Sequence, residues 1–188
     1  IYQSSIRENI ESVSVDNYSH DHTCEMIEHE FPKVRIIKNK SNVGFSKGIN
    51  IGQKFAKGEY LCFLNPDTLI SGNNFEVLLA YLDKHPKVGC ICPKILNADG
   101  TLQLASKRSF PNPMTAFFKL IGLSRIFPKS RIFGKYNLTY LDENKIHRVD
   151  AISGSFMLIP KVVFKIVGNL DEAFFMYGED LDYCYRIN

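Results

Sequence analysis

Short apolar runs alternate with amphipathic stretches along most of the chain, and this alternation predicts strands followed by helices. The expected strands lie at residues 12–15, 34–37, 60–64, 88–92 and 151–159. The expected helices, several bounded by Gly or Pro, lie at residues 22–31, 45–56, 75–84, 162–167 and 181–187. The run at 60–64 is apolar throughout, as in a central strand covered on both faces. The pattern therefore favours a layered α/β fold.

Residues 106–140 interrupt this rhythm, because they are basic, aromatic and broken by three prolines. We expect an excursion over the sheet there, with an amphipathic helix near residues 115–126. A turn at residues 97–100 predicts a hairpin before it, at residues 94–103. Residues 1–6 look helical, and no strand precedes them. Since an α/β domain normally begins with its innermost strand, we expect one domain over residues 1–188 that lacks its first strand and is truncated at both ends.

The charge of the chain is unevenly distributed. The net charge is only +3, but residues 100–141 contain seven Lys and Arg and no acid, whereas residues 171–182 contain five acids and no Lys or Arg. This arrangement favours a basic surface near an acidic site. No nucleic-acid-binding module is legible, so we expect no nucleic-acid partner. Five cysteines without metal-ligand or framework spacing favour a reducing compartment.

The longest apolar stretch lies near residues 114–127 and is too short to span a bilayer. One interpretation of residues 114–135 is a peripheral contact with an anionic membrane surface, which would place the protein at the inner face of the cell membrane. The interpretation that we favour is a helix packed on the sheet with a solvated basic edge, in a cytoplasmic protein. Any amphipathic helix would have the same pattern.

Three carboxylates, Glu179, Asp180 and Asp182, directly follow an aromatic stretch near the end of the chain. Acids are costly to bury and aromatics are costly to expose, so this junction suggests the edge of a pocket. Asp182 can pair with Arg186 one helical turn later. Glu179 and Asp180 then have no obvious cationic partner, which makes them candidates for a base or a metal ligand. A capped surface helix is the alternative, with about equal weight.

Polar residues also follow two of the predicted strands, where open α/β sheets bind ligands. The first strand ends in Asp16 and Asn17, and the most apolar strand ends in Asn65-Pro66-Asp67. Asp67 is well placed to hold a divalent cation, since Mg²⁺ needs only one or two carboxylates when a phosphate supplies the other ligands. Taken alone, the segment is better explained as a plain turn.

Considered together, these segments form an ordered series. Its members are Val15-Asp16-Asn17-Tyr18-Ser19-His20-Asp21, Asn39-Lys40-Ser41-Asn42-Val43-Gly44-Phe45 with Asn50-Ile51-Gly52, Ala56-Lys57-Gly58-Glu59-Tyr60, Leu64-Asn65-Pro66-Asp67-Thr68, Asp99-Gly100-Thr101-Leu102-Gln103, Ser153-Gly154-Ser155-Phe156-Met157-Leu158-Ile159, and Leu170-Asp171-Glu172-Ala173-Phe174-Phe175-Met176-Tyr177-Gly178-Glu179-Asp180-Leu181-Asp182. Each piece is weak alone, but the ordered set is specific. It resembles the inverting family 2 glycosyltransferases of the GT-A fold, and most closely the bacterial rhamnosyltransferase-like branch.

The resemblance implies a GT-A-type α/β fold, with a mostly parallel Rossmann-like sheet flanked by helices, and a single glycosyltransferase catalytic domain at residues 1–188. It implies inverting transfer of a sugar, with rhamnose as the specific guess, in cell-surface polysaccharide synthesis. The implied partners are a nucleotide-diphosphate sugar donor and a glycan or lipid-linked glycan acceptor, with Mg²⁺ or Mn²⁺ as cofactor. A homo-oligomer is a further expectation.

The resemblance also implies roles for individual residues. Asp180 matches the catalytic base, and Glu179 supports it or touches the acceptor. Asp67 matches the last acid of the family's metal motif; the first position of that motif is Asn65 here, so one carboxylate carries the metal site. The residues expected to bind the nucleotide sugar are Asp16, Asn17, Ser19, Asn42, Gly44, Asn50, Asn65, Arg108 and Gly154.

The chemistry of the reaction agrees with these roles. Breaking a sugar–phosphate bond leaves charge on a diphosphate, which a divalent metal can neutralise, and the acceptor hydroxyl needs a carboxylate to take its proton. Two other functions stay open. One is a non-catalytic relative that binds sugar nucleotides or glycans. The other is a nucleotidyltransferase, although the Gly-rich basic signature typical of that class is not legible in this sequence.

Overall fold

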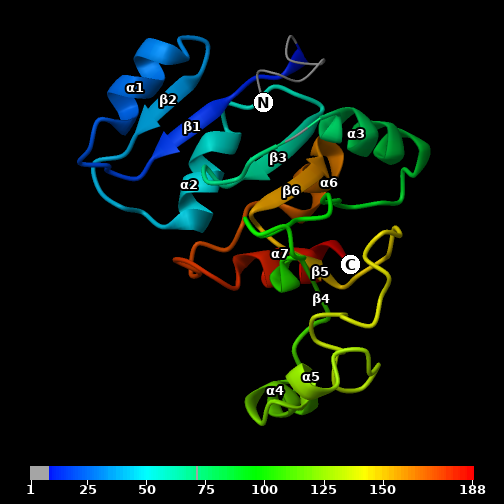
Figure 1. Ribbon diagram of the computed structural model, residues 1–188. Helices are drawn as coiled ribbons and strands as arrows, with labels where there is room; N and C mark the ends of the chain where they lie inside the picture. The colour runs from blue at the N-terminus through cyan, green and yellow to red at the C-terminus, as the bar shows by residue number, and fades with distance from the viewer. Residues whose placement is uncertain (1–8, 71) are drawn as a thin grey trace.

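The N-terminal part of the fold consists of two parallel strands, each followed by a helix (Figure 1). The structure, a computed structural model, describes residues 9–70 and 72–188, so the helix expected at residues 1–6 lies outside the described part. The elements in order are β1 (Val13–Asp16), α1 (Thr23–Glu30), β2 (Arg35–Lys38) and α2 (Phe45–Gln53). β1 and β2 pair in parallel, with Asp16 opposite Lys38. Parallel neighbours need a crossover connection, and α1 supplies it.

The centre of the molecule is the antiparallel pair β3 (Tyr60–Leu64) and β6 (Phe156–Pro160). Leu61, Phe63, Met157 and Ile159 pack with Phe164 of α6 (Lys161–Val167) and Tyr183 of α7 (Glu179–Ile187). Phe156 and Leu158 pack on the other side with three side chains of α3 (Asn74–Lys84). Alternate residues of these strands therefore enter two cores, which confirms that residues 60–64 form a strand covered on both faces.

Strand pairing differs from the expected mostly parallel sheet. Among the described strands, only β1 and β2 are parallel, whereas β3–β6 and β4 (Lys107–Arg108) with β5 (Ala151–Ile152) are antiparallel. Two parallel neighbours must be joined by a crossover that returns the chain to the same end of the sheet. β6 instead runs beside β3 in the opposite direction. The layered α/β class is confirmed, but the sheet is mixed.

Two predicted strands and one predicted hairpin are shorter than expected. Residues 88–92 make only one bridge, Ile91 to Leu158, because Gly89 weakens a strand and Pro93 has no N–H for a ladder. The run at 151–159 divides into β5 and β6 at residues 153–155. The hairpin at 94–103 is reduced to one bridge, between Leu96 and Leu102, around the expected turn.

Residues 109–136 form an arm that leaves the body at Ser109 and returns at Tyr136, where the Ser109 N–H donates to the Tyr136 carbonyl at 2.8 Å. The arm carries α4 (Pro113–Leu120) and α5 (Leu123–Ile126) at its far end, away from β3 and β6 (Figure 1). The single helix expected at 115–126 is wrong, because Gly122 adopts a left-handed conformation (φ 80°) and ends the first helix. None of the helices in the described ranges has both the length and the apolar character needed to cross a bilayer.

Candidate active site

An ion pair at the acid motif joins Asp180, in the first turn of α7, to Arg108 of β4. The Arg108 Nη2 donates to Asp180 Oδ2, and the Gly154 N–H donates to the same oxygen at 3.1 Å. Both charged side chains are only 13% exposed. The expectation that Asp180 has no cationic partner is therefore wrong: the partner lies 72 residues earlier in the chain, a separation that no local pattern reveals.

Gly154 belongs to a three-residue link between β5 and β6, residues 153–155. This link contacts both the start of α7 and the turn after β3. Its backbone holds Asp180, as described above. One residue later, the Ser155 carbonyl accepts the Asn65 N–H at 3.0 Å and the Thr68 hydroxyl at 3.4 Å. The link thus brings the acid motif of α7 and the polar end of β3 into one region.

Glu179 is buried at the start of α7, with 7% of its surface exposed. Burial is the main cause that raises the pKa of its carboxyl above the ordinary value, and the neighbouring Asp180 charge adds to it. Within the described residues, its Oε2 and the Nε of Arg108 are both buried without a hydrogen-bond partner. Buried polar atoms usually have a hydrogen-bond partner, so these two atoms mark a place where the protein alone does not satisfy its polar groups.

Asp67 has the opposite environment. It is exposed in the turn that follows β3, and its carboxylate makes no hydrogen bond or ion pair with any described residue. The backbone there is fixed, since Asn65 is bound to Ser155 and its carbonyl accepts the Thr68 N–H at 3.2 Å. Residues 9–70 and 72–188 contain no group of three or more His, Cys, Asp or Glu arranged to hold a metal. A single free carboxylate fits a divalent cation that arrives with phosphate ligands of its own.

The end of β1 lies beside the start of α2. Asp16 accepts the Ser19 N–H with both carboxylate oxygens, each at 3.2 Å, and the hydrogen bonds from Ser19 lower the pKa of this carboxyl. Asn17 donates to the Gly44 carbonyl at 3.1 Å and accepts from Asn39 at 3.0 Å. The strand end is thereby tied to the turn that opens α2.

That turn also contacts the loop before α7. The side chain of Asn42 accepts the Gly44 N–H at 3.0 Å. Gly44 has a positive φ of 84°, and a Cβ there would lie 2.6 Å from the Phe175 carbonyl oxygen. The N–H of Phe45 donates to the same carbonyl at 2.7 Å. Asn17, Asn42 and Gly44 are therefore gathered at one place. The contact with Phe175 could not be predicted, because it joins residues about 130 positions apart in the chain.

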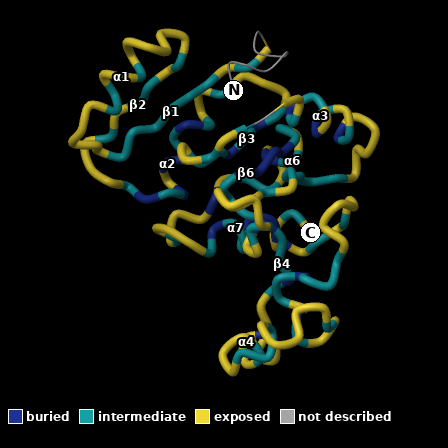
Figure 2. Tube along the Cα trace, viewed as in Figure 1, coloured by how far each residue is buried: buried dark blue, intermediate teal, exposed yellow. Residues whose placement is uncertain are grey.

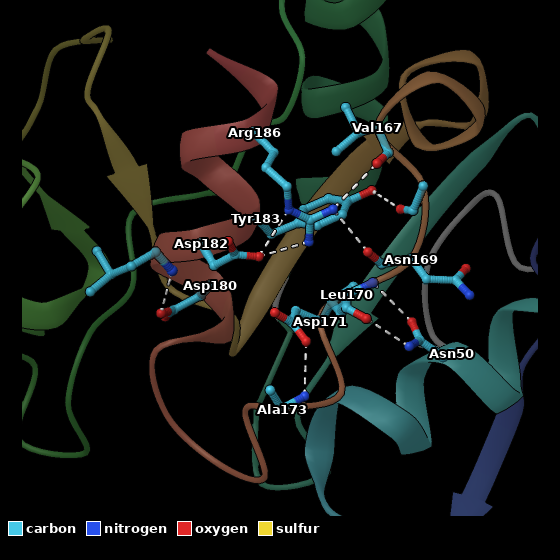
Figure 3. A network of polar contacts seen from close by, with 12 residues as sticks. Asn50, Val167, Asn169, Leu170, Asp171, Ala173, Asp180, Asp182, Tyr183 and Arg186 are labelled. Atoms are coloured by element: carbon cyan, nitrogen blue, oxygen red, sulfur yellow. Dashed lines mark hydrogen bonds and ion pairs between the residues drawn. The ribbon is translucent and has the colours of Figure 1, made fainter.

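Asn50 lies inside the protein, with 2% of its surface exposed. Its side-chain amide donates to the Leu170 carbonyl at 2.8 Å and accepts the Leu170 N–H at 3.0 Å, as Figure 3 shows. It also donates to Glu172 at 3.1 Å. Both polar atoms of Asn50 are used by this loop, so the residue is set apart from the other residues expected to bind the sugar nucleotide.

The same loop is held from α7. Arg186 donates to Asp182 at 2.9 Å, which confirms the predicted pair, and to the carbonyls of Val167 and Asn169 at 3.3 and 2.9 Å (Figure 3). These contacts fix the segment that leads into Glu179 and Asp180. Asp182 is thus occupied by a structural ion pair, while its neighbour Asp180 faces Arg108 and Gly154.

Comparisons with known proteins agree with this geometry. A family model described as glycosyl transferase family 2 matches residues 2–161. The chain is 32% identical over 180 residues to the low-salt glycan biosynthesis hexosyltransferase Agl10 of Haloferax volcanii, covering 94% of the chain and 52% of that protein. It is 26% identical over 183 residues to the N-acetylglucosaminyl-diphospho-decaprenol L-rhamnosyltransferase of Mycobacterium tuberculosis, covering 92% of the chain and 59% of that protein.

Among solved structures, the mannosyltransferase PcManGT from Pyrobaculum calidifontis, in complex with GDP-Man and Mn²⁺, matches with a TM-score of 0.64 and 13% identity. This match covers 99% of the chain and 45% of that protein. The likeness bears out the expected GT-A type of α/β fold. The chain spans between half and three-fifths of the length of the two relatives named above.

Proposed function

Because the chain belongs to glycosyl transferase family 2, we propose that it transfers a sugar, with inversion, from a nucleotide-diphosphate donor to an acceptor hydroxyl in glycan synthesis. One observation carries the proposal. On one side of the link at 153–155 lies Asp180, a mostly buried carboxylate paired with a cation. On the other side lies the turn that carries Asp67, an exposed carboxylate. An inverting transfer needs two such groups, one for the acceptor and one for the leaving group.

On the acceptor side, Asp180 is the proposed base. Within the described part of the chain, its Oδ1 accepts only the Leu181 N–H, at 2.8 Å, and so has room for a hydroxyl proton. In a single displacement, the acceptor oxygen attacks the anomeric carbon while its proton passes to Asp180. The bond from that carbon to the phosphate oxygen breaks, and its electron pair leaves with the nucleoside diphosphate. Arg108 and Gly154 hold the carboxylate in place during this step.

On the leaving-group side, Asp67 would hold a divalent cation, Mg²⁺ or Mn²⁺, together with the diphosphate of the donor. When bound, the cation supplies positive charge that stabilises the departing diphosphate. Asn65 keeps the turn in register through its bond to Ser155, so that the Asp67 carboxylate is presented from a fixed backbone. The exposed position of Asp67 suits a ligand that brings most of the metal's coordination shell.

The nucleoside would lie over the end of β1 and the turn before α2, where Asp16, Asn17, Ser19, Asn42 and Gly44 gather. Asn50 supports this region from inside, through the loop that it orients. Glu179, buried with a free oxygen, would donate to or accept from a hydroxyl of the acceptor. Rhamnose is the sugar that we put first, since one relative is named as a rhamnosyltransferase.

A transfer assay with defined donors tests the proposal. The protein would be incubated with UDP-, GDP- and dTDP-sugars, including dTDP-rhamnose, and a panel of lipid-linked and free glycan acceptors. We expect metal-dependent release of nucleoside diphosphate and a product whose anomeric configuration, read by NMR, is opposite to that of the donor. A product that retains the configuration would remove the single displacement and the role of Asp180 as base.

Two other outcomes separate the remaining functions. Nucleotide-sugar binding without product in a single-turnover experiment would identify a non-catalytic binding relative. Release of pyrophosphate would identify a nucleotidyltransferase. Either result would leave the fold intact and replace the chemistry proposed for Asp180.

A further inference from the structure

The outer face of the arm carries a concentration of exposed apolar side chains. Met114, Phe117 and Ile121 follow one another at helical spacing, so they share one face of α4 and its C-terminal end. Their exposed fractions are 60%, 53% and 48%, and that of Leu120 is 85%. Ile126, the last residue of α5, is exposed by 66%. Groups of exposed apolar side chains often mark interaction sites.

The inner face of the arm is packed, so the outer face is not a sign of a poorly formed segment. Phe118 contacts Phe133 edge to face at 4.9 Å between ring centroids, and Phe133 contacts Phe127 at 5.7 Å. Leu138, just beyond the arm, is 7% exposed. The Asn112 side chain caps α4 by accepting the Thr115 N–H at 2.9 Å. The arm therefore has a small core of its own, and exposed positions remain along α4 (Figure 2).

The charged side chains of the arm all have one sign. Five exposed cations lie on the arm, and the segment from 100 to 141 contains no acid. None of the five makes an ion pair with a described residue. These cations are Lys119, whose Nζ lies 4.7 Å from the centroid of the Tyr136 ring, and Arg125, Lys129, Arg131 and Lys135. An arm that combines exposed apolar side chains with exposed positive charge and no acid matches the chemistry of an anionic lipid surface, with acyl chains below and phosphate above.

We propose that the outer face of α4 and α5 docks on an anionic lipid bilayer, lying in the plane of the headgroups without crossing them. A second copy of the chain is a poorer occupant, because two arms facing each other would bring together eight exposed cations that have no ion-pair or ring partner among the described residues, four from each arm. The arm begins one residue after Arg108, which holds Asp180. Docking would therefore fix the acid side of the candidate active site relative to the membrane surface.

Vesicle binding tests the proposal without any sugar donor, so its result is independent of the proposed function. The protein would be floated with vesicles of phosphatidylcholine alone and with vesicles of equal parts phosphatidylcholine and phosphatidylglycerol. We expect flotation with the anionic vesicles only. Arg125→Glu with Lys129→Glu should weaken binding at least about thirtyfold, since each cation near such a surface contributes about fivefold.

Apolar variants and a matched control test the face itself. Phe117→Ser with Leu120→Ser should abolish flotation. Val162→Ser with Ile166→Ser removes two equally exposed apolar side chains beside lysines on α6 and should leave binding unchanged. Circular dichroism would check that each variant is folded.

The absence of tryptophan from the chain allows a direct reporter. Phe117→Trp should show a blue-shifted emission on anionic vesicles, while Ile166→Trp should not. Three results would overturn the proposal: no flotation of the unsubstituted protein, equal flotation of the arm variants, or an unshifted Phe117→Trp emission. Conversion of a dimer to a monomer by the arm variants would assign the face to a second copy instead.

Discussion

Asp180 and Asp67 lie on the two sides of one short link, residues 153–155, and have contrasting environments. Asp180 is 13% exposed, accepts from Arg108 and Gly154, and begins a helix. Asp67 is exposed and its carboxylate has no partner among the described residues. Where two carboxyl groups in one site have different surroundings, the surroundings assign their roles. The held carboxylate suits proton transfer in a fixed geometry, and the free one suits a cation that arrives with the substrate.

The largest expected effect comes from removing the base. Asp180→Asn keeps the size of the side chain and its bond from Gly154, but removes the proton acceptor. We expect sugar transfer to fall by about 10²–10⁴-fold, while the affinity for the donor nucleotide stays unchanged. Initial rates of nucleoside diphosphate release would measure it. Asp182→Asn on the same helix is the control, because that carboxylate pairs with Arg186 and should affect transfer little.

The next effect concerns Arg108, the cation that pairs with Asp180 and has no counterpart at Asp67. Arg108→Gln leaves Asp180 charged and mostly buried without its cation, so we expect a loss of about 3 kcal/mol in the free energy of unfolding. Urea denaturation would measure it. The double variant Arg108→Gln with Asp180→Asn should recover most of that loss. If the double variant is no more stable than Arg108→Gln alone, the ion pair is not the reason that Arg108 matters.

Removal of the exposed carboxylate should give a smaller effect of a different kind. For Asp67→Asn we expect transfer to fall by roughly 10²-fold, since charge stabilisation by a metal contributes several kcal/mol. Its stability should not change. Glu59→Gln, an exposed carboxylate just before the opposite end of β3, is the matched control and should behave as the unsubstituted protein. Equal losses in both variants would mean that surface charge, rather than position, determines the effect.

The smallest effect concerns Glu179 and depends on pH. Burial raises the pKa of this carboxyl above its ordinary value of 4.5. As pH rises past that value, the unfolded chain ionises first, so the contribution of Glu179 to stability is lost as pH rises through the folded pKa. Glu179→Gln should therefore raise the unfolding midpoint by a few degrees near neutral pH and leave it unchanged below pH 4.5. A lower unfolding midpoint for Glu179→Gln than for the unsubstituted protein near neutral pH would contradict the raised pKa of Glu179.

The positions of both carboxylates could be predicted from the sequence, because each follows a local pattern. Asp67 ends an apolar strand, and Asp180 follows an aromatic run at a helix start. Their environments could not be predicted in this way. The partner of Asp180 comes from β4, a two-residue strand whose only signal is its pairing with β5. Asn50 was a candidate for ligand binding because of its motif, yet its contacts with Leu170 depend on a loop 120 residues later.

The arm shows the same limit. Periodicity revealed an amphipathic segment, but it does not say which partner an apolar face meets. We favoured packing on the sheet, whereas α4 lies at the far end of the arm and its inner face is packed by the arm's own rings. Gly122, which ends α4, was the one local sign that a single long helix would not form.

Thermal-shift binding tests the contrast between the two carboxylates most directly. UDP, dTDP and GDP would be added with and without Mn²⁺ to the unsubstituted protein, Asp180→Asn and Asp67→Asn. We predict Mn²⁺-dependent stabilisation by one nucleotide in the first two proteins and its loss in Asp67→Asn. Loss of the metal dependence in Asp180→Asn with retention in Asp67→Asn, or no response of the unsubstituted protein to any of the three nucleotides, would contradict the assignment.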